Sequence, residues 1–225
     1  MIHLLWPTIR PDVMVQTYQV WTSKSDNPGN INTYFAVNNI QDQSAIVELF
    51  KQLNLQHRYE ILISGEKPGV VHACNYLTQL PQLDGPDSDV VILASDDMYA
   101  PEGWDTWILS AIKQPNVALL INDGYIKQDN VTLPIMTMGC FKILNRIIYH
   151  PSYIHSYSDT ELFHNLQEMN MLCDRWNDSP IFEHKNWANH KRQFDSVDRA
   201  IMNVVNSDSE NWGKRKNMIL QDRLK

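Results

Sequence analysis

The chain has 225 residues, of which 43% are hydrophobic and 20% charged, and its formal net charge is −7. This composition excludes an intrinsically disordered chain and fits one globular domain. No apolar run approaches the ~20 residues that span a bilayer, and the first residues lack the basic leader of a signal peptide, so we expect no membrane span.

The three cysteines, Cys74, Cys140 and Cys173, show no CxxC spacing. An odd, scattered set argues against a disulfide framework or a zinc knuckle. Buried thiols in a reducing compartment are the simpler interpretation, so we expect a cytoplasmic protein.

Short apolar runs alternate with amphipathic segments through the first half of the chain. Strands are predicted at residues 2–6, 33–37, 59–63, 89–94 and 117–121. Helices are predicted from Pro11, from Asp42 as an N-cap, after 68–69, and from Trp104. This alternation predicts a mainly parallel sheet with helices on both faces, and ligands beyond the carboxyl ends of its strands.

The pattern loosens after residue 122. Helices are predicted at 159–169 and 196–206, with a helical tail after 207 and a short strand at 180–183. Ser158 and Glu161 have the spacing of a helix capping box. Residues 184–225 carry nine Lys/Arg and five Asp/Glu, a net charge of +4, against −11 for the first 183 residues. This basic segment indicates either anion binding or a solvated terminal helix.

The strongest chemical signal is the pair Asp96-Asp97, which follows the apolar run Val90–Ala94. Two adjacent carboxylates at a ligand-binding strand end are costly unless a cation or donor offsets their charge. A hard divalent ion shared with substrate phosphates would do so, whereas a plain turn is the alternative. The position after a buried strand favours the metal.

These residues resemble the DxD-type motif of the GT-A glycosyltransferases, especially the short family 2-like enzymes. In that family the motif is followed by a Pro-containing turn and an aromatic-led helix, as in Ala100-Pro101-Glu102-Gly103-Trp104 here. The resemblance covers about residues 1–190. It implies an α/β, GT-A type, Rossmann-like sheet that binds a nucleotide sugar. It assigns Asp97 to the metal and Asp96 to the donor ribose, while Ser95 replaces the motif's first Asp.

The resemblance also implies further donor-binding residues. The loop after the first strand is similar to the family's Pro-Thr loop. His72 is more simply structural than a diphosphate ligand. The implied donor-binding side chains, besides Asp96, are Thr8, Arg10, Asn38, Lys67 and Asn75.

Two later segments resemble the family's catalytic elements. Ser158-Asp159-Thr160-Glu161-Leu162 is similar to its "EDtEL" segment, in which the central Asp is the catalytic base; Asp159 takes that role, and Ser158 replaces the preceding Glu. His184, after the last predicted strand, matches a second metal ligand, with His190 as the competing candidate. Mn²⁺ or Mg²⁺ is the implied cofactor.

The implied activity is metal-dependent, inverting transfer of a sugar from a nucleoside-diphosphate sugar to an acceptor hydroxyl. We expect residues 1–122 to bind the donor, 123–190 to form the acceptor and catalytic half, and 191–225 to form a C-terminal helical segment. A nucleotidyltransferase is one alternative, disfavoured because the loop 6–11 contains no Gly. A non-catalytic nucleotide-sugar-binding module is another.

The acceptor is open between a saccharide and a hydroxymethylated base of phage DNA. Basic clusters around Trp187 and Trp212 favour nucleic acid, because cations track phosphates and aromatic faces stack bases. The acidic balance of the whole chain favours the saccharide.

Overall fold

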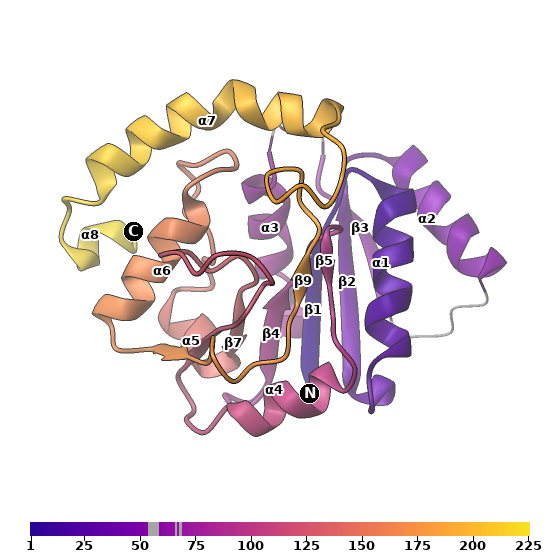
Figure 1. Ribbon diagram of the computed structural model, residues 1–225, viewed down its shortest axis with the longest axis horizontal. Helices are drawn as coiled ribbons and strands as arrows, with labels where there is room; N and C mark the ends of the chain where they lie inside the picture. The colour runs from indigo at the N-terminus through magenta and orange to yellow at the C-terminus, as the bar shows by residue number, and fades with distance from the viewer. Residues whose placement is uncertain (54–58, 66, 68) are drawn as a thin grey trace.

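The structure, a computed structural model, describes residues 1–53, 59–65, 67 and 69–225 (Figure 1). Its central sheet has the strand order β3-β2-β1-β4-β7-β6-β8, and β5 pairs with β9 in a separate ribbon. The strands are β1 (Ile2–Pro7), β2 (Ile31–Val37), β3 (Tyr59–Ile63), β4 (Val90–Leu93), β5 (Met98–Tyr99), β6 (Ala118–Leu120), β7 (Ile135–Thr137), β8 (Leu172–Asp174) and β9 (Glu183–His184).

The helices alternate with these strands and then gather in the second half of the chain. They are α1 (Pro11–Ser23), α2 (Ile40–Gln52), α3 (Val71–Thr78), α4 (Trp104–Ala111), α5 (Met138–Ile143), α6 (Ser158–Glu168), α7 (Ser196–Arg215) and α8 (Leu220–Arg223), with short 3₁₀ turns at Pro28–Asn30 and Pro81–Leu83.

The sheet is mainly parallel, as the sequence predicts. Strands β1 to β4 are parallel to one another, and β6 is parallel to β8. Only β7 runs antiparallel, between β4 and β6. The predicted mixed α/β class, with helices flanking a largely parallel sheet, is therefore confirmed.

Each face of the sheet has its own apolar core. Side chains alternate along a strand, so Leu4 and Trp6 of β1 face one side and Leu5 faces the other. Helices α1, α2 and α4 cover the first side, where Trp6, Trp21 and Trp104 are fully buried. Helices α3, α5 and α6 cover the second. Because helices cover both faces of the sheet, we expect a ligand to bind at the carboxyl ends of its strands.

Several local predictions are wrong in detail. Asn39, and not Asp42, is the N-cap of α2: its side-chain oxygen accepts a hydrogen bond from the Asp42 backbone N–H at 2.9 Å. Ser158 and Glu161 form no capping box, because Tyr157 occupies the N-cap position and the Ser158 hydroxyl donates to the carbonyl of His155. The strand expected at 180–183 is reduced to β9.

Helix α7 extends the predicted helix of 196–206 to Arg215. In Figure 1 it runs along the top of the molecule, over the carboxyl ends of the central strands, from the side of α3 toward α6 and α8. Within the described part of the chain, no helix combines the length and apolar character needed to cross a bilayer.

Candidate functional site

The β5–β9 ribbon brings together the two side chains expected to bind a metal. Asp97 directly precedes β5, and the ribbon pairs Met98 with His184. The Lys185 backbone N–H donates to the Asp97 carbonyl at 2.7 Å, which closes the ribbon. As a result, His184 Nε2 lies 3.4 Å from Asp97 Oδ2, beyond the carboxyl end of β4.

Asp97 and His184 shift each other's pKa values. Burial opposes ionisation of Asp97, but hydrogen bonds from His184 and Ser95 outweigh it and lower the pKa of Asp97 to about 2. Burial also opposes the charged imidazole, yet the hydrogen bond and charge of Asp97 raise the pKa of His184. The charges of Asp123 and Asp159 raise it further, so both carboxylates lie within electrostatic range of the imidazole.

The positions of Asp97 and His184 fit two ligands of a divalent cation whose other ligands come from the substrate and water. Adjacent ligands of an octahedral ion with ~2.1 Å bonds lie about 3 Å apart, close to the separation of Asp97 Oδ2 and His184 Nε2. A carboxylate and an imidazole together suit Mn²⁺. Within the described ranges, no three His, Cys, Asp or Glu side chains cluster as a complete metal site. The remaining ligands would therefore come from donor phosphates and water.

Arg10, Thr8 and Asp96 form a second cluster beside the first. The Arg10 guanidinium binds both oxygens of Asp96, with Nε to Oδ2 at 3.0 Å and Nη2 to Oδ1 at 2.5 Å. The Thr8 hydroxyl donates to the same carboxylate at 3.3 Å. Burial raises the pKa of Asp96, and Arg10 offsets part of the shift. Three of the side chains expected to bind the donor are thus joined across the ends of β1 and β4.

The start of α7 reaches this cluster. Arg10 Nη1 donates to Asp195 Oδ2 at 3.1 Å, and Asp195 is the N-cap of α7. The C-terminal segment, which lies beyond the sequence resemblance, is therefore tied directly to the candidate donor site.

Asp159 lies in the first turn of α6. Its Oδ2 accepts from the Asn130 side chain at 3.3 Å, and its Oδ1 from the Thr160 backbone N–H at 2.9 Å. Burial raises the pKa of Asp159, and these hydrogen bonds offset only part of the effect. A carboxylate with a raised pKa is suited to accept a proton near neutral pH.

Among the described residues, the side chains of the other expected donor-binding residues form no hydrogen bond or ion pair with these clusters. Asn38 is half-buried just after β2, and Lys67 is exposed in the loop before α3. Asn75 lies on α3, and its buried side-chain oxygen accepts no hydrogen bond from the described residues. His72 Nε2 lies 2.8 Å from the Ser64 carbonyl, which gives this imidazole a structural contact.

Two further residues whose charges interact with the candidate site were not predicted from the sequence. Asp123 follows β6, as Asp96 and Asp97 follow β4, so the same strand-end argument would have found it. Its carbonyl accepts the His184 backbone N–H at 2.9 Å. His155 lies in an irregular segment without any periodic signal. Burial lowers the pKa of His155, and the charges of Asp208 and Asp97 offset only part of this shift.

Many cations of the basic C-terminal segment pair within the molecule. Arg192 binds both oxygens of Asp198, at 2.5 and 2.6 Å, and Lys191 Nζ lies 3.2 Å from Glu183. Lys185 Nζ lies 3.8 Å from the centre of the Tyr99 ring. Much of the positive charge of this segment is therefore used in contacts within the protein.

No protein-family model and no curated protein sequence matches the chain. Solved structures match it in fold. A crystal structure of S. aureus TarS 1–349 superposes with a TM-score of 0.64 at 11% identity, over 99% of this chain and 76% of that chain. A structure of TarS 1–349 in complex with UDP-GlcNAc superposes with a TM-score of 0.64 at 12% identity, over 87% of this chain and 60% of that chain.

The mannosyltransferase PcManGT from Pyrobaculum calidifontis, in complex with GDP-Man and Mn²⁺, has a TM-score of 0.55 at 11% identity, over 99% of this chain and 78% of that chain. These likenesses show that the chain has the fold of the GT-A glycosyltransferases.

Proposed function

We propose that the protein is a metal-dependent, inverting glycosyltransferase that moves a sugar from a nucleoside-diphosphate sugar to an acceptor hydroxyl. The observation that carries the proposal is the meeting of Asp97 and His184, 3.4 Å apart, at the carboxyl edge of a GT-A sheet. Support comes from the similar folds of TarS and PcManGT, which are described in complex with UDP-GlcNAc and with GDP-Man and Mn²⁺.

Asp97 and His184 would hold Mn²⁺ or Mg²⁺, which when bound neutralises charge on the leaving diphosphate. Thr8, Arg10 and Asp96 would bind the nucleotide. The remaining donor-binding residues are proposed to be Asn38, Lys67 and Asn75. Donor binding would then occupy residues 1–122, and acceptor binding and proton transfer 123–190.

Asp159 acts as the general base in this proposal. It takes the proton of the acceptor hydroxyl while that oxygen bonds to the anomeric carbon and the bond from carbon to the diphosphate oxygen breaks. Because attack and departure occur on opposite sides, the anomeric centre is inverted. The hydrogen bond from Asn130 to Oδ2 of Asp159 supports this role, because it would restrict the orientation of the base.

The acceptor class favoured by the surface is a saccharide. A groove of about 480 Å³ lies beside α6, lined by the loop residues 127–129 and by Phe163 and Gln167 of the helix. Asp159, Phe163 and Gln167 are spaced i, i+4, i+8, so they share one side of α6. Amide and charged side chains with one aromatic ring suit the hydroxyl groups and apolar faces of sugars.

The direct test is hydrolysis and transfer with a panel of nucleoside-diphosphate sugars, beginning with UDP-GlcNAc and GDP-mannose. A chelator should abolish turnover and Mn²⁺ should restore it. Asp97→Ala should reduce turnover by about 10²-fold or more, because a metal supplies several kcal/mol of charge stabilisation. Glu102→Gln, which removes an exposed carboxylate a few residues away, is the matched control and should leave the rate unchanged. Full activity in excess chelator would refute the metal requirement.

A further inference from the structure

Helix α6 begins without a side-chain cap, although it carries the proposed base in its first turn. Its N-cap residue, Tyr157, has left-handed backbone geometry with φ of 62° and makes no capping hydrogen bond. The preceding segment, from residue 144 to 157, contains no helix or strand. An uncapped helix end frays unless other groups hold it. The direction of Asp159 therefore depends on contacts from outside α6.

Asp208 of α7 supplies one such contact. Its side chain is fully buried, and its Oδ1 accepts the backbone N–H of Ile154 at 2.9 Å. Its Oδ2 accepts the N–H groups of His155 and Ser156, both at 2.8 Å. Three consecutive amides thus converge on one carboxylate, in charge-assisted hydrogen bonds of the stronger kind.

Arg215, the last residue of α7, supplies a second contact. Its Nε and Nη2 donate to the two oxygens of Glu161, each at 2.8 Å. Glu161 lies within the first turns of α6 and is only 2% exposed. The Tyr153 hydroxyl donates to the same carboxylate at 2.8 Å. The segment around Asp159 is therefore held from α7 on both sides of the base.

The start of helix α3 also contacts the segment that α7 holds. The Val71 backbone N–H donates to the Ile154 carbonyl at 3.3 Å. Gly69 passes so close that a Cβ there would lie 2.0 Å from the same carbonyl oxygen. The segment is already in close contact with the start of α3. Loss of the α7 contacts would therefore let it move away from α3.

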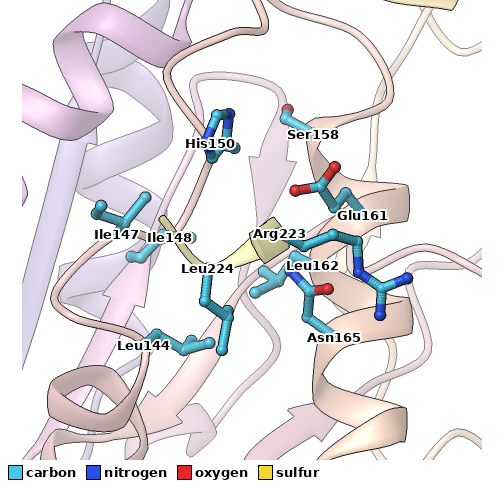
Figure 2. Close-up of a pocket in the computed structure, with 10 residues that line it drawn as sticks. All are labelled: Leu144, Ile147, Ile148, His150, Ser158, Glu161, Leu162, Asn165, Arg223 and Leu224. Carbon is cyan, nitrogen blue, oxygen red and sulfur yellow. The ribbon is translucent and has the colours of Figure 1, made fainter. Parts of the chain in front are cut away.

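The most deeply buried contacts of α7 are polar, although Trp212 also stacks on the ring of His164 in α6, with ring centroids 5.2 Å apart. The only fully buried side chains of α7 are Asp198 and Asp208. Figure 2 shows Glu161, together with Arg223 of α8, around a cavity of about 20 Å³, which has room for about one water molecule and none for a sugar. The role of these charges is therefore to hold α6, not to bind a ligand there.

We propose that α7 positions the catalytic base: Asp208 and Arg215 are positioning residues that clamp the segment 153–161 and so aim Asp159 at the acceptor hydroxyl. This inference rests on the proposed function of Asp159. It adds that the part of α7 from Asp208 to Arg215, away from the contact of Asp195 with Arg10, is required for the transfer step and not for holding the donor.

The test compares Asp208→Asn with Glu210→Gln, an exposed position on the same helix that loses the same charge. In Asp208→Asn, one carboxylate oxygen becomes an NH₂ group that faces backbone N–H donors. We expect kcat for transfer to fall by about tenfold or more, with UDP or GDP affinity in Mn²⁺ within twofold of wild type. Glu210→Gln should match the wild type in both. A folded Asp208→Asn protein with wild-type kcat, or one that loses nucleotide affinity and kcat equally, would overturn the proposal.

Amide hydrogen exchange gives a readout that does not require turnover. Asp208→Asn should speed exchange in residues 154–160 and leave β1 and β4 protected. If the wild type turns over no donor sugar, the proposed function fails. The hydrogen-exchange measurement would still show whether α7 holds the segment 153–161. If Asp208→Asn does not fold, Arg215→Lys replaces it: it keeps the charge and loses the two-pronged geometry, and it should lower kcat without changing nucleotide affinity. Unchanged kcat and unchanged exchange in Arg215→Lys would count against the clamp.

Discussion

Asp97 and Asp159 are both half-buried carboxylates, yet their surroundings shift their pKa values in opposite directions. Burial opposes ionisation of both. Asp97 has His184 and Ser95 as partners, which lower its pKa to about 2. Asp159 accepts only from an amide side chain and a backbone N–H, and its pKa is raised. Carboxylates whose pKa values diverge in this way commonly divide a reaction between them.

Replacing the proposed base should separate transfer from donor binding. Asp159→Asn preserves the size of the side chain and removes the proton acceptor. We expect transfer to fall by about 10²-fold or more, the usual contribution of a general base, with nucleotide affinity retained. Steady-state kinetics together with calorimetric nucleotide titration measure both. Normal transfer by this variant would reduce Asp159 to a helix-start residue.

The pH dependence of kcat follows from the direction of the same shift. A base must be deprotonated to act, and burial raises the pKa of Asp159 above its ordinary value of about 4. Activity should therefore fall, as the pH is lowered, at a pH above that ordinary value. A pH profile of kcat with Mn²⁺ saturating measures this limb. An acidic limb at or below about 4 would be inconsistent with a buried base.

At the scale of elements, short contacts between distant segments build the site. The β5–β9 ribbon is only two residue pairs long, yet it places His184 beside Asp97. The capping box of α7, formed by Asp195 and Asp198, fixes the point where this helix starts above Arg10. The positions of these elements therefore depend on contacts with residues far away in the sequence.

The N-cap of α7 can be tested by a matched pair of substitutions. Asp195→Ala removes both the capping oxygen and the ion pair with Arg10, and should lower the free energy of unfolding by about 1 kcal/mol. Asp195→Asn keeps a capping oxygen and should cost less than half of that, because a partly exposed ion pair contributes little. Urea denaturation measures both. Equal losses would show that the charge, and not the cap, dominates.

At the scale of the whole molecule, the charge distribution decides between acceptors. The chain carries −7 overall, and its C-terminal cations largely face carboxylates of the same molecule. Paired cations release few counterions when a phosphate backbone approaches, so affinity for nucleic acid should be weak.

Binding to duplex DNA tests this distribution. We expect no binding of plain or hydroxymethylated duplex at ~50 mM salt by fluorescence anisotropy, whereas a phosphate-tracking site would bind and weaken steeply as salt rises. Salt-sensitive binding of the hydroxymethylated duplex would restore a nucleic-acid acceptor.

The sequence alone predicted the parallel half of the fold because its signals are local. Each of β1 to β4 is a short apolar run between helical patterns, and such runs form buried strands wherever they lie. The pair Asp96-Asp97 was visible for the same reason, since polar residues after a buried strand indicate a ligand-binding edge. The antiparallel β7, the ribbon strands and β8 are two or three residues long, too short for any period to show.

Only the tertiary structure decided which distant side chains meet. His184 is separated from Asp97 by 87 positions, and His155 has no pattern around it; their placement depends on strand pairing and on α7. The sequence also could not show that Arg10 binds Asp96, or that Asp208 holds the segment before α6. Periodicity reports how a residue sits within its own element, whereas the pairing of charges across elements depends on how those elements pack.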